Sequence, residues 1–334
     1  PFPSGSLAVV FILFEGSLTL KFEEIRGLQK VVRNILTLGV VITWSAIAIA
    51  THLLLDFPWA LAILFGAIMV VTGPTVIVPM LRTVRPNAKI SNILRWEGIV
   101  IDPLGAILAV LVFEVLLSIQ LQGHAEVGHT LYMFAKTIVV GLSIGAIAGY
   151  SFGLLLRRHL LPEYLHNVAA LALVFGTFAV SNEISEESGL LTVTVLGIWL
   201  ANMKNVQVEN ILDFKEDLSI FLISGLFILL AARLNLDSFT QLGLGAVILF
   251  LFIQFVVRPV KVFVCSIGSD LTWQEKAMIS WIGPRGIVAA AVTALFALRL
   301  QDIGYEKPDL LVPLSFAIII GTDLVQGSHT KSQA

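Results

Sequence analysis

The chain alternates between long apolar runs and short polar segments. Eleven of the runs approach or exceed the roughly 20 residues that an α-helix needs to cross the hydrocarbon core of a bilayer. In chain order these predicted spans are residues 7–20, 35–55, 59–84, 94–117, 132–156, 165–182, 190–203, 218–232, 242–263, 276–298 and 310–325. We expect the first span to be truncated. We expect the spans near 15 residues to be tightly packed inner helices, or to extend beyond these limits.

The composition supports this pattern. Of the 334 residues, 57% are apolar and only 13% are charged, which is about half of the charged fraction usual in soluble domains. The expected fold class is therefore an all-α polytopic membrane protein. The net charge of −2 gives no support for nucleic-acid binding, and the single cysteine, Cys265, excludes a disulfide framework and a cysteine-based metal site.

Basic residues are distributed unevenly between the segments that join the spans. The segments after odd-numbered spans hold most of the Lys and Arg residues, including Lys21, Arg157 and Lys261, whereas the segments after even-numbered spans hold few. Basic loops tend to stay on the cytoplasmic side of a membrane. The odd-numbered segments and the C-terminus are therefore expected in the cytoplasm.

Two predicted spans contain a Gly-Pro pair at mid-depth, Gly73-Pro74 in the third span and Gly283-Pro284 in the tenth. Proline lacks an amide donor and clashes with the preceding turn, and glycine adds backbone freedom, so each pair is expected to interrupt its helix. The alternation of the spans gives these two helices opposite directions, which is typical of an inverted-repeat secondary transporter. The alternative is two simple proline kinks, which are common in membrane helices.

The fifth span contains Gly141, Gly145, Gly149 and Gly153, each four residues apart. Such a stripe lets another helix approach closely. Residues 149–153 also match the Gly-x-Ser-x-Gly pattern of a hydrolase, but that motif requires a strand–turn–helix setting and a histidine partner. We therefore favour packing. No His-Glu-x-x-His motif or paired catalytic Asp spacing supports the further alternative of an intramembrane enzyme.

Asp102 lies about eight residues into the fourth span and is followed by Pro103. A carboxylate near the bilayer centre costs roughly 3 kcal/mol on insertion scales, so such residues are rare and usually functional. Pro103 removes the amide that would bond the carbonyl of Ile99, and a free carbonyl beside a carboxylate suits a hard cation. Because desolvation disfavours the charged carboxylate, we expect a proton and a monovalent cation to compete for Asp102. The alternative is a structural Asp that pairs with a buried base.

Other charged residues also fall within the spans. Glu97 precedes Asp102 by five residues, roughly 140° around an ideal helix, so the two carboxylates are not expected to share a face. Arg258, near the inner end of the ninth span, is the best-placed base for a structural ion pair with Glu97. Arg285 is expected to stabilise unwound carbonyls of its own span. Glu15, in the first span, is a candidate ligand or gate.

At these positions the chain resembles the sodium/proton exchanger branch of the monovalent cation/proton antiporter superfamily, and especially its bacterial NhaP-like members. The resemblance covers nearly the whole chain and rests on residues 14–18, 72–74, 97–102, 283–286 and 325–327. It implies a homodimer in the lipid of a bacterial-type inner membrane, with two crossed discontinuous helices in a mobile core. It also implies that residues 1–334 are the transmembrane exchanger domain of a longer protein. The absent parts would be two N-terminal helices and a cytoplasmic nucleotide-binding regulatory domain, and residues 326–327 would mark the end of the final helix.

The resemblance also implies roles for individual residues. Asp102 matches the essential transport aspartate, and Glu97 with Arg258 matches an ion pair of the core. Thr72 matches a position whose backbone helps to bind the ion, and Glu15 matches an acid near the site. The residues of the unwound helices would be Gly73, Pro74, Gly283, Pro284 and Arg285.

The expected function is an elevator-like, electroneutral exchange of a monovalent cation, Na+ or K+, for H+ around Asp102, with no cofactor beyond the transported ions. Three positions depart from the family pattern: Ile101 replaces the usual Asn, Gly73 replaces a frequent Asp, and Gly98 replaces a common Ser. One alternative is a K+ efflux system gated by a cytoplasmic regulatory domain. Another, motivated by Ile101 and Gly73, is a non-transporting sensor or degenerate copy.

Overall fold

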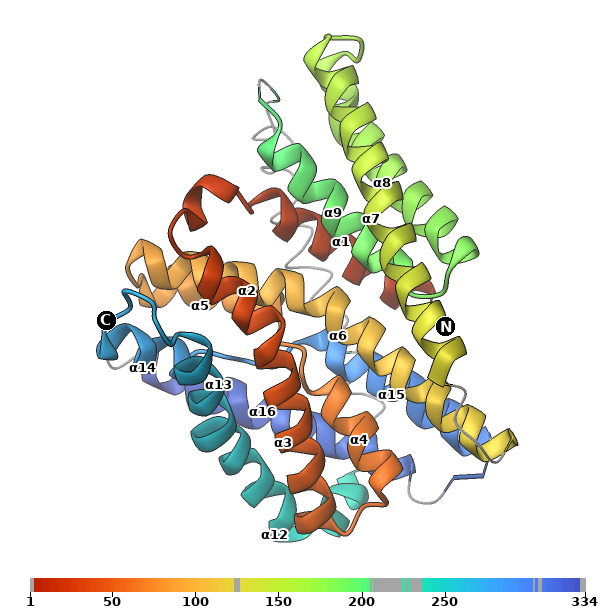
Figure 1. Ribbon diagram of the computed structural model, residues 1–334, viewed down its shortest axis with the longest axis vertical. Helices are drawn as coiled ribbons and strands as arrows, with labels where there is room; N and C mark the ends of the chain where they lie inside the picture. Colours follow the sequence, from red (N-terminus) through yellow and green to blue (C-terminus); the bar gives the residue numbers. More distant parts are fainter. Residues whose placement is uncertain are drawn as a thin grey trace. The chain divides into compact units, whose positions relative to one another are not determined.

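The computed structural model describes residues 3–122, 127–204, 236–302 and 308–330, together with residues 206, 224, 225, 228, 304 and 305 (Figure 1). Within these ranges every regular element is a helix. Among the described residues, six helical stretches are long and apolar enough to cross a membrane. The predicted all-α polytopic fold is therefore confirmed. The predicted span 218–232 lies almost entirely outside the described residues.

The chain divides into two compact units. The first unit comprises Pro1–Glu24 and Leu117–Ile228, and the second comprises Ile25–Leu116 and Leu229–Ala334. Each unit is thus assembled from two segments that are far apart in the sequence.

In the first unit, a short central helix packs against three others. Its helices are α1 (Pro3–Leu18), α7 (Val127–Arg157), α8 (His166–Ile184) and α9 (Ser188–Asn202), with the short 3-10 helices η1 (Phe22–Ile25) and η2 (Glu163–Leu165). Helix α9 contacts α1, α7 and α8, and most of its side chains are buried. This confirms that a span of about 15 residues can be a packed inner helix.

The glycine stripe of α7 faces α9. A Cβ atom at Gly145 would lie 2.5 Å from the carbonyl oxygen of Thr192, and one at Gly149 would lie 2.8 Å from the Cβ of Trp199. Ser151 donates its hydroxyl hydrogen to the carbonyl of Ala148, 3.0 Å away in the same helix. The stripe therefore serves helix packing, as predicted.

The second unit holds the same pattern twice, namely three spans of which the middle one is broken. The first set is α3 (Leu38–Leu55), α4 (Trp59–Ile68) with α5 (Pro74–Val84), and α6 (Ala88–Gln122), of which residues up to Leu116 belong to this unit. The second set is α12 (Leu236–Phe252) with α13 (Arg258–Cys265), α14 (Trp273–Trp281) with α15 (Ile287–Asp302), and α16 (Leu311–Thr330). Helix α2 (Gln29–Leu36) precedes α3, and the π-helical turn η3 (Ile253–Val257) joins α12 to α13.

Both Gly-Pro pairs lie where the sequence predicts interruptions. The backbone leaves the helix between Ile68 and Pro74, and again between Trp281 and Ile287. Pro74 occupies the first turn of α5, where its missing amide costs nothing. The end of the last helix differs from expectation, because α16 continues to Thr330 and residues 326–327 lie inside it.

Candidate functional site

The two helix breaks cross with backbone against backbone. The amide of Gly73 donates to the carbonyl oxygen of Pro284 at 3.0 Å. A Cβ atom at Gly73 would lie 2.2 Å from the Cα of Gly286, and one at Gly286 would lie 2.3 Å from the Cα of Gly73. No side chain fits at either position without movement of the main chain. The prediction of two crossed discontinuous helices is therefore confirmed.

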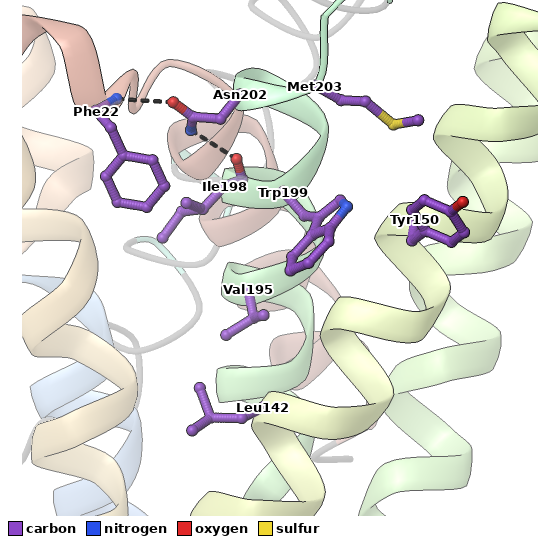
Figure 2. A pocket seen from close by; sticks show the side chains of 8 residues that line it. All are labelled: Phe22, Leu142, Tyr150, Val195, Ile198, Trp199, Asn202 and Met203. Atoms are coloured by element: carbon purple, nitrogen blue, oxygen red, sulfur yellow. Dashed lines mark hydrogen bonds between the residues drawn. The ribbon is translucent and has the colours of Figure 1, made fainter.

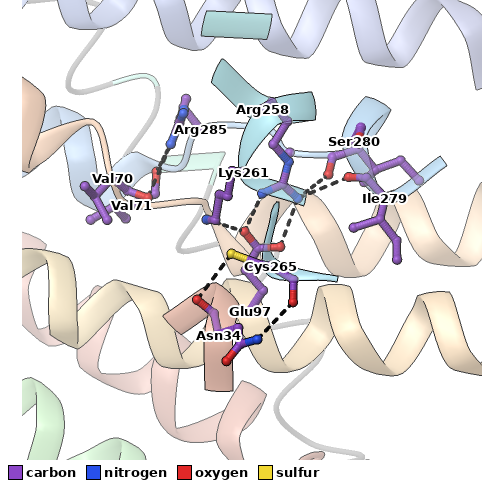
Figure 3. Close-up of polar contacts among 12 residues, drawn as sticks. Asn34, Val70, Val71, Glu97, Arg258, Lys261, Cys265, Ile279, Ser280 and Arg285 are labelled. Carbon is purple, nitrogen blue, oxygen red and sulfur yellow. Dashed lines mark hydrogen bonds and ion pairs between the residues drawn. The ribbon is translucent and has the colours of Figure 1, made fainter. Parts of the chain in front are cut away.

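Arg285 connects the second break to the first. Its Nη1 atom donates to the carbonyl oxygens of Val70 and Val71, at 3.3 and 3.1 Å (Figure 3). Its backbone amide donates to the hydroxyl of Thr322 at 3.4 Å. The sequence pattern predicts that Arg285 serves carbonyls of its own span. The crossing corrects this, because it brings the free carbonyls of the first break within reach of the guanidinium.

Two glutamines hold the second break from its other side. Gln254, in the π-helical turn η3, donates to the carbonyl of Trp281 at 3.0 Å. Gln326 of α16 accepts from the amide of Gly283 at 3.2 Å and donates to the side-chain oxygen of Gln254 at 3.1 Å. Neither glutamine is among the site residues predicted from the sequence. The available signal was a buried amide side chain within an apolar run, which normally requires hydrogen-bond partners.

Glu97 lies at the centre of a buried charged cluster. Both carboxylate oxygens accept from the guanidinium of Arg258, with Nη2 at 2.9 Å from Oε2, and Oε1 also accepts from Lys261 Nζ at 2.7 Å (Figure 3). All three side chains are at most 4% exposed. Bidentate, charge-assisted bonds of this kind are the strongest hydrogen bonds that side chains form.

The same cluster supports the second break. Nη2 of Arg258 donates to the carbonyl oxygens of Ile282, at 2.7 Å, and Ile279, at 3.3 Å. Gly283 leaves room for the guanidinium, since a Cβ atom there would lie 2.5 Å from Nε of Arg258. Arg258 therefore links α6, α13 and the break after α14.

Lys261 is the member of the cluster for which the sequence-based prediction is wrong. The count of basic residues assigns it to the cytoplasmic segment after the ninth span, but α13 continues to Cys265 and buries Lys261 one turn after Arg258. Gly39 of α3 leaves space for it, because a Cβ atom there would lie 2.8 Å from Cε of the lysine. The spacing of three residues between Arg258 and Lys261 places both on one helix face and could have indicated this role.

Asp102 is also fully buried, but its surroundings are different. Neither of its carboxylate oxygens has a hydrogen-bond partner among the described residues. The hydroxyl of Thr72, 1% exposed in the first break, likewise has no partner within the described ranges. Gly105, one turn after Asp102, packs on Val71, because a Cβ atom at this glycine would lie 2.3 Å from Cγ2 of the valine. The turn of α6 that carries Asp102 therefore lies against the first break.

This arrangement has a direct chemical consequence. Burying an unpaired ionised carboxylate costs several kcal/mol, so Asp102 must bind a proton or a cation when it is closed off from water. Carboxylate, hydroxyl and carbonyl oxygens are the ligands that hard cations prefer. Within the described part of the chain, no group of three or more His, Cys, Asp or Glu side chains could hold a metal ion.

Glu15 belongs to a different compact unit from the other predicted site residues. It lies half-buried on α1 in the first unit, whereas the other predicted site residues belong to the second unit. Its suggested role as a ligand or gate stays a prediction.

Comparison with known proteins places this geometry in a family. The family model for transmembrane sodium/hydrogen exchangers matches residues 5–332. The Na(+)/H(+) antiporter NhaH of Halobacillus aidingensis is 27% identical over 340 residues, covering 98% of this chain and 81% of that protein. The K(+)/H(+) antiporter NhaP of Alkalimonas amylolytica is 27% identical over 331 residues, covering 97% of this chain and 55% of that protein. This chain thus spans about half the length of the second relative.

A solved structure shares the fold. The sodium proton antiporter MjNhaP1 from Methanocaldococcus jannaschii, determined at pH 8, superposes with a TM-score of 0.84 at 21% sequence identity. The match covers 98% of this chain and 85% of that one. Together with the apolar helices, the family match identifies an integral membrane protein, and the chain belongs to the transmembrane sodium/hydrogen exchanger family.

Proposed function

We propose that this chain exchanges a monovalent cation, Na+ or K+, for H+ across a membrane, and that Asp102 is the site at which the two ions compete. One observation carries the proposal. Asp102 is fully buried next to the crossing of two broken helices and has no hydrogen-bond partner among the described residues. A carboxylate in that setting binds either a proton or a cation, but not both, and this exclusion couples the two fluxes.

The names of the relatives support the proposal. They include antiporters of Na+ and of K+ with H+, so both cations are candidates for this chain. With one unpaired carboxylate in the site, the simplest stoichiometry is one cation for one proton.

The neighbouring residues have separate tasks in this mechanism. Thr72 offers a hydroxyl and unwound backbone beside Asp102 as oxygen ligands. Glu97, Arg258 and Lys261 hold α6 against α13 and the second break, so the site moves as one body when it is exposed first to one side and then to the other. Arg285 donates to carbonyl oxygens of the first break and keeps the two breaks together.

The proposal can be tested in everted membrane vesicles by following the dissipation of an imposed pH gradient when Na+, K+ or Li+ is added. We expect Asp102→Asn to abolish the response. Asp270→Asn, which changes an exposed acid of the same unit, is the matched control and should exchange normally. Exchange by Asp102→Asn at the wild-type rate would refute the assignment, and absence of exchange by the wild-type chain would favour a sensor or degenerate copy.

Three further parts of the proposal concern assembly and orientation. We propose a homodimer, a C-terminus on the cytoplasmic side of a bacterial-type inner membrane, and an exchanger domain spanning residues 1–334 that works with a regulatory domain in a longer protein. The distribution of basic residues supports the orientation. Light scattering on the purified protein tests the dimer, and labelling of a cysteine introduced near the C-terminus tests the side.

A further inference from the structure

An apolar groove runs along one side of the first unit and has no part in the proposed exchange site. It has a volume of about 570 Å³ and is lined by Phe22, Leu142, Tyr150, Val195, Ile198, Trp199, Asn202 and Met203 (Figure 2). Leu142 and Tyr150 are eight residues apart on α7, as are Val195 and Met203 along α9, so the groove extends for about 12 Å along both helices. This volume lies within the usual range of ligand sites.

The groove offers mainly hydrocarbon contacts, and the polar side-chain groups of its lining are the Tyr150 hydroxyl, the Trp199 indole N–H and the amide of Asn202. Asn202 is the one amide-bearing side chain in the lining, and both its amide nitrogen and its amide oxygen form hydrogen bonds within the first unit. Its Nδ2 donates to the carbonyls of Leu20, at 2.8 Å, and Ile198, at 2.7 Å, and its Oδ1 accepts from the amide of Phe22 at 2.7 Å. A ligand that fills the groove is therefore mainly apolar.

Aromatic rings line the end of the groove that is nearer to the chain's basic segments. Phe22, Tyr150 and Trp199 are 53%, 53% and 43% exposed. Tyr and Trp gather where hydrocarbon meets the lipid headgroups. This end of the groove therefore has the composition of a membrane interface.

Exposed basic residues flank the same end. Lys21 directly precedes Phe22, and Lys204 directly follows Met203. Arg157 lies in the last turn of α7, seven residues and two turns beyond Tyr150 on the same helix face. Two acidic residues, Glu23 and Glu24, lie nearby in η1, so one positive charge remains in excess even without Arg158.

From this combination we propose that the groove binds an acyl chain of an anionic phospholipid, whose headgroup lies against Lys21, Arg157 and Lys204. All three residues belong to segments after odd-numbered spans, so in the orientation proposed above the lipid comes from the cytoplasmic leaflet, whose anionic lipids attract such basic residues. The site lies outside the exchange site and does not depend on Asp102. A phospholipid of this kind would anchor the first unit in the membrane.

Lipid contact at the groove can be measured through the fluorescence of Trp199. The full chain is purified in detergent and titrated with phosphatidylglycerol or phosphatidylcholine whose acyl chains carry bromine, which quenches indole fluorescence on contact. The chain has six tryptophans, so the signal of the groove is the difference between wild type and Trp199→Phe. We expect half-quenching of this difference at about tenfold less phosphatidylglycerol than phosphatidylcholine.

The headgroup contribution is tested with the triple variant Lys21→Gln/Arg157→Gln/Lys204→Gln, which should lose the preference. These side chains are exposed, so the fold should persist, and Lys136→Gln, on α7 but away from the groove, should keep the preference. Native mass spectrometry should show one retained phosphatidylglycerol on the wild type and none on the triple variant. Equal quenching by both lipids would overturn the headgroup assignment. No quenching of Trp199 by either lipid would show that protein covers the groove, and would overturn the proposal.

Discussion

Two carboxylates five residues apart on α6 have opposite surroundings. Glu97 accepts hydrogen bonds from Arg258 and Lys261, whereas Asp102 has no partner among the described residues, although both side chains are at most 1% exposed. The difference comes from the helices that cross α6 at each point. Helix α13 brings two cations to Glu97, while the first break, whose Val71 lies against Gly105, brings unwound backbone to the turn that carries Asp102. A single helix can therefore carry both a rigid support and an ion site.

The largest expected effect follows from neutralising Asp102. Asp102→Asn keeps the shape of the side chain but removes its charge, so exchange should fall at least 100-fold. Because Asp102 has no ionic partner to lose, the free energy of unfolding should change by no more than about 1 kcal/mol. Vesicle exchange rates and thermal unfolding of the purified protein measure the two quantities. A large loss of stability would mean that Asp102 has a structural partner, and the contrast with Glu97 would fail.

At Glu97 we expect a large loss of stability, in contrast to the small change expected for Asp102→Asn. Glu97→Gln leaves Arg258 and Lys261 buried without a counter-charge, and breaking a buried pair in this way costs about 3–5 kcal/mol. The variant should unfold at a much lower temperature and accumulate poorly in the membrane. Normal melting would show that the cluster does not hold the second unit together.

Gly73 tests the backbone crossing without altering any charge. In Gly73→Ala the new Cβ atom would meet the main chain of Gly286, so the breaks must separate, at a cost of about 1–3 kcal/mol. Exchange should decrease at least tenfold. Gly176→Ala is the control, because nothing lies within 4 Å of a Cβ atom at that position of α8. Equal exchange by both variants would contradict a close crossing.

Replacing Lys261 should have the smallest effect on function. Its effect on stability should change sign between the wild-type chain and the Glu97→Gln variant. Lys261→Met leaves Glu97 paired with Arg258, so we expect a loss of no more than about 1–2 kcal/mol. In the Glu97→Gln background the same change removes an unpaired buried cation and should stabilise the protein. Thermal unfolding of the four proteins in this double-mutant cycle gives the coupling. If the stability changes of Glu97→Gln and Lys261→Met simply add in the double variant, Lys261 does not interact with Glu97.

The sequence allowed prediction of features that depend on local chemistry. The Gly-Pro pairs located both helix breaks, because proline and glycine interrupt a helix whatever surrounds it. The apolar runs located the spans, but the count of basic residues assigned Lys261 to the cytoplasmic segment that follows the ninth span. A lysine near the end of an apolar run suggests a loop position, whereas in the fold Glu97 provides the counter-charge that allows Lys261 to be buried.

Hydrogen-bond partners that come together only because the helices cross could not be predicted from the sequence. Arg285 bonds to Val70 and Val71, and Gln326 bonds to Gly283. Each bond joins segments whose contact depends on how α4, α14 and α16 pack, which no local pattern encodes. The ion pair of Glu97 with Arg258 was expected from the position of Arg258 near the inner end of the ninth span and from the family resemblance, but the third member of the cluster was not.

The most direct test of the central claim is proton release from the purified protein when a cation is added. If H+ and cation compete for Asp102, weakly buffered wild-type protein should release up to about one proton per chain on addition of Na+ or K+. The cation concentration for half-release should rise up to about tenfold for each unit of pH decrease. Asp102→Asn should release none, and Asp270→Asn should behave as wild type. Proton release from Asp102→Asn equal to that of the wild type would contradict the account.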